Sequence, residues 1–581
     1  MSEPIPTRID VAIIGAGPSG STLASLLTKY RPESNVWIFE REVFPRHKVG
    51  EGLIVDINRI LHDMDAIDVL EEHGFPQKHG TTFVWGGDRK PNTFLFREGQ
   101  ALVGSPEGYQ LDYTWHVDRP TYDQLLADTA QNHGAKIAFG HQVDTILEEN
   151  GRVVGLEVLD RDGQRHRIET QWVVDCAGGS GPLTKERGVR RLDTDLRNIA
   201  LFGYHRNLQW RDDLQGPPDL RRTLIMTHPK GWVWFIPIGR DVTSVGFVTS
   251  VQAYQDEKAR RGGQLDPEAY YQEVLSELPE YDALFPGSEC FDYREAGRKV
   301  NVVQEFSYSC DNLWGPGWVT CGDGAGFVDA ILSIGCYVAQ AHAQFLAYAL
   351  GSVLAEECSA ELALGSYETT VSENLAAFRS VAHMFYAFNS SRSDWWRDCS
   401  RLVRDSAYIP DGEDKASFLA FANGFTARYG MYEEAVNAFG NMFLVGLGES
   451  LFPDEELFDE GRMDATMRSA RSLLGKDPIL ELCCEFEAVD FALPSAGSGR
   501  LTRATRLVFG RETAPGQDIA RRIVVPAGQE AAIHLIDGTR RLSDIVKAVD
   551  VASSEIQHLF LRCLCAGVVR ERASVSRRVA M

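Results

Sequence analysis

The sequence of 581 residues lacks the features of several large classes of protein. It contains no uninterrupted apolar run long enough to span a bilayer, and its first residues, MSEPIPTRID, include no apolar signal segment. We therefore expect a cytoplasmic protein without a membrane partner. The length favours one large catalytic core with an accessory domain.

Positive charge and paired cysteines are also scarce. The chain has 59 Lys and Arg against 82 Asp and Glu, which gives a net charge of −23. Because phosphate backbones attract basic surfaces, no nucleic acid is expected as the main partner. The 11 cysteines are odd in number and form no C-x-x-C framework. They predict reduced thiols and no metal site.

A glycine-rich turn follows the first apolar run of the chain. Residues 11–14 have the pattern of a strand, the segment after the turn has helical spacing, and the turn fits G-x-G-x-x-G. Such a turn offers the free N–H groups of a helix N-terminus to a pyrophosphate. The next apolar segment ends in a glutamate 20 residues after the last glycine, where a ribose hydroxyl needs an acceptor. The predicted dinucleotide contacts are Gly15, Gly17, Gly20 and Glu40.

Only one such fingerprint occurs, so we expect FAD without a dedicated NAD(P)H domain. Three further segments, FPRHKVGEGL, VDRPTYDQLL and VVDCAGGSG, together with VTCGDGAGFVDAILSIGCYVAQ, resemble the flavoprotein hydroxylase and halogenase superfamily. The resemblance implies an α/β fold with a Rossmann-like FAD-binding core of the PHBH type. It also implies that a helix starting near Ser333 points its positive end at the flavin. The further FAD contacts that it implies are Arg46, Arg119, Asp323 and Gly335.

Two tryptophans in the segment KGWVWFIPIG carry the most specific resemblance. On a strand, Trp232 and Trp234 would share one face, which by itself also suits a buried core. The motif W-x-W-x-I-P resembles a signature of flavin-dependent halogenases, and FVDAILSIG approximates their second signature, F-x-x-P-x-x-S-x-G. The resemblance extends to about residue 400. It is strongest to the chloramphenicol-pathway type, which acts on carrier-bound, acyl or phenolic intermediates of antibiotic biosynthesis.

The halogenase resemblance implies a reaction and its partners. A separate flavin reductase would supply reduced FAD, and O2 with chloride or bromide would yield hypohalous acid. This would halogenate an electron-rich or enolisable carbon of a small molecule, either free or tethered to a carrier protein. Trp232 and Trp234 would shield the flavin from water and organic substrate, and Ser333 would shape the halide end of the site.

The lysine in the segment GFPQKHGTTFVW is the candidate for halogen delivery. The resemblance implies that Lys78 lies between flavin and substrate, where it either hydrogen-bonds hypohalous acid or forms a haloamine. Burial lowers the pKa of a lysine and frees its amine as a nucleophile. A surface lysine before a strand is the alternative. Lys48 is a competing candidate, although it belongs to the flavin-binding segment.

Three positions depart from the halogenase pattern. Ala330 stands where the second signature has proline, so the fixed φ of that residue is lost. Leu332 replaces the glutamate of tryptophan halogenases, which implies that free tryptophan is not the substrate. Glu305 stands where some relatives have an aspartate esterified to the flavin methyl group. A glutamate could form the same bond, and an ordinary solvated glutamate is the alternative.

Composition and patterning along the chain predict the domain limits. The segment ALPSAGSGRL is expected to be a linker, and a helix–turn–helix pattern followed by a strand comes after it. The predicted domains are a discontinuous FAD-binding core at 1–204 and 296–350, a β-sheet substrate domain at 205–295, a helical substrate cap at 351–490 and a winged-helix-like module at 501–581. That module holds 13 Lys and Arg against 8 Asp and Glu, which leaves DNA binding or the docking of an acidic carrier protein open.

Three other functions remain possible on these residues. A flavin monooxygenase on the same fold would insert oxygen instead of halogen. A reductase similar to the geranylgeranyl reductases would need an open lipid tunnel. A flavoprotein without catalytic activity would act through the basic C-terminal module. The tryptophan pair and Lys78 favour halogenation, and Ala330 weakens it.

Overall fold

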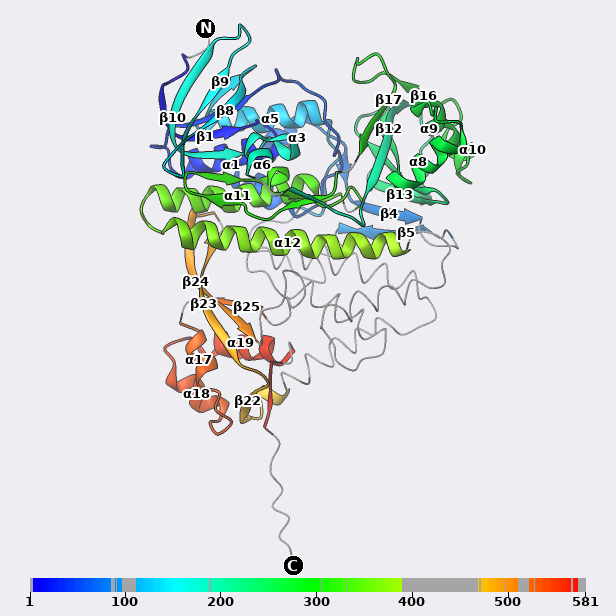
Figure 1. Cartoon of the computed structure of the whole chain (residues 1–581). Coiled ribbons are helices and arrows are strands. Elements are labelled where there is room, and N and C mark those ends of the chain that lie inside the picture. Colours follow the sequence, from blue (N-terminus) through cyan, green and yellow to red (C-terminus); the bar gives the residue numbers. More distant parts are fainter. Residues whose placement is uncertain are drawn as a thin grey trace, which may run out of the picture. The chain divides into compact units, whose positions relative to one another are not determined.

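A computed structural model divides the chain into two compact units, Met1–Cys399 with Ala496–Arg500 and Ser400–Ser495 with Leu501–Met581 (Figure 1). The residues that it describes are 4–84, 89, 91–96, 111–187, 190–304, 306–331, 333–388, 469, 472–495, 497–509, 522–526, 528–565 and 568–572. Among them, no helix has the length and hydropathy needed to cross a bilayer. The same residues contain no group of three or more His, Cys, Asp or Glu side chains arranged for a metal ion, and their cysteines are free thiols.

The first sheet of the first unit carries the predicted dinucleotide fingerprint. Its strands follow the order β19-β20-β10-β1-β2-β7, with β9 beside β10 and β8 beside β9. The strands are β1 (Arg8–Ile14), β2 (Val36–Glu40), β7 (Lys136–Phe139), β8 (Gln142–Glu149), β9 (Arg152–Leu159), β10 (Arg165–Asp175), β19 (Trp314–Gly315) and β20 (Trp318–Thr320). The four neighbours β20, β10, β1 and β2 are parallel, so their carboxyl ends meet at one edge of the sheet. This edge is where ligands bind in open α/β sheets.

Helices cover this sheet and continue beyond it. α1 packs against both α5 and α11, and α12 runs along α11 (Figure 1). α11 is almost entirely buried, which explains why its sequence is apolar on every side. The helices of this part are α1 (Pro18–Tyr30), α2 (Ile57–Asp63), α3 (Ile67–His73), α5 (Arg119–Asn132), α6 (Pro182–Glu186), α11 (Gly335–Leu354) and α12 (Ala360–Phe388). Smaller pairings involve β3 (Gln77–Lys78), β6 (Thr114–Trp115), β11 (Arg190–Leu192), β18 (Tyr308–Cys310) and β21 (Gly326–Phe327).

The second sheet of this unit carries the tryptophan strand. Its order is β16-β12-β15-β14-β13-β4-β5, with β17 beside β12. The strands are β4 (Gly80–Val84), β5 (Pro91–Leu95), β12 (Asn198–Arg206), β13 (Arg222–His228), β14 (Gly231–Pro237), β15 (Val242–Ser250), β16 (Glu289–Phe291) and β17 (Val300–Gln304). A β-sheet was expected at 205–295, and β13, β14, β15 and β16 lie in that interval. The expected limits were too narrow, because β4, β5, β17 and most of β12 lie outside it. The predicted interval also contains α7 (Asp212–Gln215), α8 (Val251–Arg260), α9 (Pro267–Ser276) and α10 (Tyr281–Leu284).

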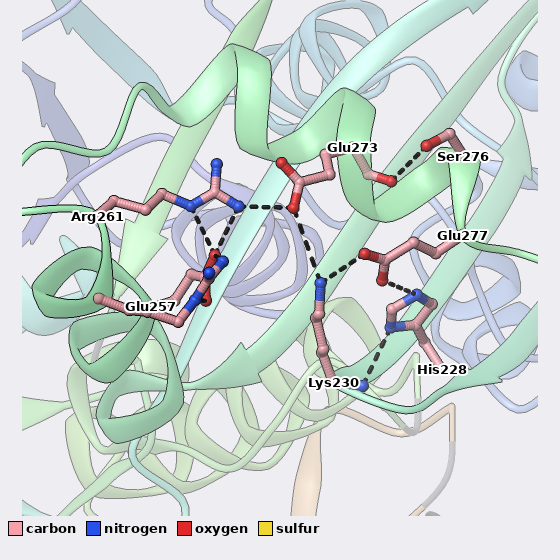
Figure 2. A network of polar contacts seen from close by, with 8 residues as sticks. His228, Lys230, Glu257, Arg261, Glu273, Ser276 and Glu277 are labelled. Atoms are coloured by element: carbon pink, nitrogen blue, oxygen red, sulfur yellow. Dashed lines mark hydrogen bonds and ion pairs between the residues drawn. The ribbon is translucent and has the colours of Figure 1, made fainter.

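Ion pairs fasten the turn before the tryptophan strand to the helices behind the sheet (Figure 2). Lys230 Nζ lies 2.6 Å from Glu277 Oε1 and 4.0 Å from Glu273 Oε1. Glu273 in turn accepts from Arg261 at 2.6 Å, and His228 Nε2 lies 3.4 Å from Glu277 Oε2. Most of these side chains are partly exposed, so each pair contributes at most about 1 kcal/mol. Their main effect is to fix the position of the β13–β14 turn.

In its described residues, the second unit has a core of its own, built from three helices and two small sheets. Its elements are β22 (Leu480–Leu482), β23 (Phe486–Ser495), β24 (Arg500–Phe509), β25 (Arg522–Pro526), α17 (Glu530–His534), α18 (Leu542–Ala548), α19 (Ser553–Cys565) and β26 (Val569–Glu571). The strand order is β23-β24-β25, and β22 pairs with β26. A helix pair followed by a strand fits the predicted pattern, while the assignment to a winged helix stays a prediction.

Two expectations for this region were wrong. The stretch expected to be a linker forms the end of β23, a tight turn and the start of β24. Gly497 and Gly499 in the turn have φ angles of 64° and 65°, which glycine adopts without strain. In addition, β22 and the start of β23 are strands within the interval predicted to be a helical cap. The end of the stretch that resembles the chloramphenicol-pathway halogenases, SDWWRDCS at residues 393–400, lies outside the described residues.

Candidate active site

A cavity of about 880 Å³ lies within the first unit. At one end it is lined by the turn after β1 and by the carboxyl ends of β2 and β10. At the other end it is lined by the face of the second sheet that carries the tryptophans. The predicted site residues that the fold brings together along its wall are Gly15, Gly17, Glu40, Arg46, Arg119, Trp232, Trp234, Asp323, Ser333 and Gly335.

The glycine turn at the first end has the shape of a pyrophosphate cradle. Gly15 has a φ of 96°, and a Cβ added to Gly20 would fall on the carbonyl oxygen of Gly15. Gly20 therefore lies behind the cavity wall and permits the turn to pack on the helix. No side chain caps α1, so its first N–H groups are open to an anion. These features fit the diphosphate of FAD.

A buried carboxylate stands at the expected ribose position. Glu40 ends β2, is 5% exposed, and accepts hydrogen bonds of 2.9 Å from the backbone N–H groups of Ala16 and Glu42. The guanidinium of Arg46 lies 3.9 Å from the same carboxylate and 3.2 Å from Asp123. Glu40 is therefore held at the edge of the sheet, beside the glycine turn, where it can accept from a ribose hydroxyl.

Arg119 begins α5 and is anchored on two sides. Its Nε and Nη2 donate to the two oxygens of Asp123 at 2.8 and 3.1 Å, and its Nη1 donates to the Val49 carbonyl at 2.7 Å. The sequence interpretation missed Asp123, although its position four residues after Arg119 on a helix is a recognisable pairing signal. The fork holds the segment that contains Val49 against the first sheet.

Asp323 lies in the short turn after β20 and is partly buried. Burial raises the pKa of its carboxyl group to about 6, and the positive charges of Arg119 and Lys48 oppose that rise. Lys48 lines the same end of the cavity, where partial desolvation and the positive charge of Arg46 lower the pKa of its amine. Lys48 therefore belongs to the dinucleotide end of the cavity.

The tight contact at Gly20 leads to a test of FAD binding. In the variant Gly20→Ala, the new Cβ would displace the backbone of the glycine turn, because it would meet a carbonyl oxygen and not a flexible side chain. We expect FAD to bind about 100-fold more weakly, as measured by quenching of flavin fluorescence. Gly365→Ala is the matched control, because nothing lies within 4 Å of its Cβ position. An unchanged affinity in folded Gly20→Ala would contradict this assignment of the cradle.

Strand β14 presents its two faces to different surroundings. Val233 and Phe235 point into the apolar core that the helices α8–α10 cover. Trp232 and Trp234 point the other way and line the cavity, with their ring centroids 5.9 Å apart and their planes at 51°. Both indoles are almost fully buried, as a core strand requires, and they also line the cavity, so core packing and a place in the cavity wall hold together.

Each indole N–H has a specific partner. Trp232 donates to the hydroxyl of Tyr386 at 3.0 Å, and Trp234 donates to the hydroxyl of Ser244 at 3.2 Å. Gly246 lies opposite Trp234 in the neighbouring strand β15. A Cβ at Gly246 would overlap the indole ring of Trp234. The glycine thus leaves the space that this ring occupies.

Lys78 is completely buried, so its interpretation as a surface lysine is wrong. It ends β3, pairs with Thr114 in β6, and donates from Nζ to the Leu53 carbonyl at 2.7 Å. Its ammonium group also lies 5.8 Å from the centroid of the Phe96 ring. Burial lowers the pKa of the Lys78 amine to about 7. The amine is therefore available in neutral form near physiological pH.

A glycine brings Lys78 next to the cavity wall. A Cβ at Gly52 would lie 3.5 Å from Lys78 Nζ, from Ser333 Oγ and from Thr223 Oγ1. Gly52, Thr223 and Ser333 line the cavity, and Lys78 lies directly behind them. Ser333 has a φ of 53°, an unfavourable conformation for a non-glycine residue. Two residues later Gly335 begins α11.

Comparison with known proteins identifies the family. The model of the tryptophan halogenase family matches residues 10–106 and 103–408, which is well over half of the chain. The chain belongs to the tryptophan halogenase family. The prediction of a flavin-dependent halogenase from the two signatures is confirmed.

Individual relatives of this halogenase act on different substrates. A tryptophan 2-halogenase of Chondromyces crocatus is 26% identical over 405 residues, which cover 69% of this chain and 72% of the relative. A 1H-pyrrole-2-carbonyl-[peptidyl-carrier protein] chlorinase of Pseudomonas fluorescens is 28% identical over 394 residues, covering 65% and 84%. The structure of the flavin-dependent halogenase CmlS covers 98% of this chain and 97% of its own at a TM-score of 0.71 and 23% identity, which shows a shared fold. The predicted enzyme class and FAD are thereby confirmed.

The sequence interpretation of this halogenase missed a second buried carboxylate beside the cavity. Glu51 is 1% exposed and accepts from the Tyr204 hydroxyl at 2.8 Å. Burial raises the pKa of its carboxyl group to about 7. Its position before Gly52, within a segment assigned to flavin binding, was the available signal. Asp329 was also missed, whereas Glu305 and Leu332 lie outside the described residues.

Proposed function

We propose that this halogenase uses reduced FAD, O2 and chloride or bromide to halogenate an electron-rich or enolisable carbon of a natural-product intermediate. The observation that carries the proposal is the completely buried amine of Lys78 beside Ser333, at one end of a cavity whose other end fits FAD. The indoles of Trp232 and Trp234 line the same cavity.

The cavity residues have separate roles in the proposed reaction. When bound, reduced FAD supplies the activation of O2 through which halide is oxidised to hypohalous acid. Trp232 and Trp234 exclude water and the organic substrate from the flavin end. The neutral amine of Lys78 takes the halogen from hypohalous acid, which forms an N–halogen bond and releases water. The halogen then passes to the substrate carbon, which loses a proton as the free amine is restored.

The substrate is proposed to be a small molecule or an acyl group tethered to a carrier protein. The chlorinase relative acts on a carrier-bound pyrrole, which supports this class. The tryptophan 2-halogenase relative bears the name of a different substrate, so the exclusion of free tryptophan stays a prediction. A separate flavin reductase is the proposed source of reduced FAD, because the chain has one dinucleotide fingerprint. The role of the C-terminal module and a covalent flavin bond at Glu305 also stay predictions.

Product analysis tests the proposed reaction. Purified protein is incubated with a flavin reductase, NADH, O2 and either chloride or bromide, together with phenolic and monochlorodimedone-like probes. Mass spectrometry is expected to show halogenated product that depends on the halide present, and a trap for free hypohalous acid is expected to capture little of it. Hydroxylated product with every probe and halide would instead support a flavin monooxygenase on the same fold.

A further inference from the structure

A line of hydrogen bonds connects the shield of the cavity to the loop before α11. The Trp232 N–H donates to the Tyr386 hydroxyl at 3.0 Å, and that hydroxyl donates to Asp329 Oδ1 at 2.8 Å. The Tyr386 hydroxyl has a single proton. Its oxygen accepts the hydrogen bond from the indole N–H, so the hydroxyl proton is free to be donated to the Asp329 carboxylate. The direction of the line is therefore determined, and the carboxylate of Asp329 is its end.

Asp329 also holds the backbone of the loop that follows it. Its Oδ1 accepts from the Ile331 N–H at 2.9 Å, and its Oδ2 accepts from the Asn198 side chain at 3.0 Å. Asp329 is 1% exposed, and Asn198 begins β12 of the second sheet. One buried carboxylate thus connects this sheet, the loop at residues 329–333 and, through Tyr386, the helix α12.

The loop itself contains features that need such support. Ala330 lacks the fixed φ that proline has at this place in the family signature, and Ser333 adopts a φ of 53°. The loop is closed by the Ser333 N–H, which donates to the Ala330 carbonyl at 3.1 Å. The additional bond from Ile331 to Asp329 restricts the same turn. Displacement of Asp329 would therefore also displace Ser333.

The two indoles of the shield are held in different ways. Trp234 donates to Ser244, which belongs to the adjacent strand β15 of the same sheet. Trp232 donates instead to Tyr386, which belongs to α12, an element outside the sheet. The position of Trp232 consequently depends on α12 and Asp329, whereas the position of Trp234 is determined within the sheet.

We propose that Tyr386 and Asp329 are positioning residues that hold the Trp232 indole and the loop at residues 329–333 in one joint arrangement. The inference rests on the proposed function in assigning the shield to Trp232 and the halide end to this loop. A displacement of the Trp232 indole would therefore be accompanied by a displacement of the loop at the halide end. Loss of either member of the line frees the indole to rotate and admits water to the flavin end of the cavity.

Tyr386→Phe is the direct test, because it removes only the hydroxyl. We expect the halogenated product formed per O2 consumed to fall about 10-fold and released hydrogen peroxide to rise, with FAD affinity unchanged within about twofold. Asp329→Asn is expected to act similarly, and the double variant to be no worse than the more severe single variant. Tyr367→Phe is the matched control, because this α12 tyrosine donates to the Thr320 carbonyl at 2.9 Å, away from the shield.

A spectroscopic readout separates this inference from the proposed reaction. The 11 tryptophans are labelled as 5-fluorotryptophan, and the signal of Trp232 is assigned by its loss in Trp232→Phe. We expect this 19F signal to shift and broaden in Tyr386→Phe and Asp329→Asn, and to stay unchanged in Tyr367→Phe. An unchanged Trp232 signal would overturn the inference. So would a ratio of halogenated product to consumed O2 in Tyr386→Phe that equals the parental ratio. If the parent protein yields no halogenated product, the proposed function fails and the 19F signal still decides the positioning role.

Discussion

Replacement of Lys78 by alanine is expected to reduce halogenated product by about 1,000-fold while reduced flavin is still oxidised at nearly the parental rate. Lys78 lies behind the cavity wall beside Gly52, and it is not one of the residues predicted to hold FAD. Its loss should therefore leave oxidant formation intact and remove only delivery. Mass spectrometry of the product, with flavin oxidation followed by absorbance, measures both quantities. Halogenated product at the parental level in Lys78→Ala would contradict the assignment.

The pH dependence of the same reaction reports the form of the amine. Burial lowers the pKa of Lys78 to about 7, so the neutral fraction rises about tenfold between pH 6 and pH 8. If the neutral amine takes the halogen, single-turnover product formation should rise by a similar factor over this range. A fall over the range would instead indicate that the ammonium form hydrogen-bonds hypohalous acid.

Lys78→Met measures how much the burial of the Lys78 amine lowers the free energy of unfolding. Burial lowers the pKa of the amine to about 7 in the folded protein, against an ordinary value of 10.5 in the unfolded chain. Between these values the unfolded state holds one more proton, so the free energy of unfolding of the parent rises with pH. Lys78→Met should remove this dependence and raise the free energy of unfolding by roughly 2–4 kcal/mol at pH 7. A less stable variant would mean that the bond from Lys78 to Leu53 outweighs desolvation.

Truncation of the tryptophan pair is expected to have the second-largest effect. In Trp232→Ala or Trp234→Ala, the halogenated product per O2 should fall about 10- to 100-fold, with a matching rise in hydrogen peroxide or hydroxylated probe. Each indole lines the cavity, and its removal opens space for water and organic substrate beside the flavin end. Oxygen consumption, peroxide release and product mass measured in one reaction give the ratio.

Two further variants separate shielding from stability. Gly246→Val keeps both tryptophans but places side-chain atoms in the space that the Trp234 indole occupies, so it should also uncouple the reaction. Phe235→Ala alters the opposite face of the same strand, within the core. It should lower the free energy of unfolding by about 3–5 kcal/mol while the remaining folded protein keeps its coupling. Equal uncoupling in Phe235→Ala and Trp234→Ala would show that the effect comes from general loosening of the sheet.

Local patterns in the sequence predicted the glycine turn and the buried Glu40 that line one end of the cavity. The glycine turn, the helix after it and Glu40 lie close together in the chain, and their chemistry depends mainly on neighbouring backbone. The strand with Trp232 and Trp234 was predictable in the same way, because alternation puts both residues on one face. The two signatures also identified the family, since each is a short stretch of contiguous residues.

Composition gave a wrong prediction where the same residue types suit two different structures. Glycine and serine between residues 492 and 501 suit a linker as well as a tight hairpin turn, and the structure contains the turn. The limits of the second sheet were also missed, because β4 and β5 join it from more than 100 residues before β12. Strand pairing at such separations leaves no local signal.

By itself the sequence determined which residues could bind FAD, which strand holds the paired indoles and which lysine is the candidate for delivery. Only the tertiary structure decided which face of that strand lines a cavity. The strand has apolar residues at successive positions, so both of its faces are apolar and the sequence does not distinguish them. It also decided that Lys78 is buried beside Ser333, and that Trp232 depends on Tyr386 and Asp329. These contacts join residues far apart in the chain. Burial, pKa and hydrogen-bond partners follow from such contacts, so they exist only once the chain has folded.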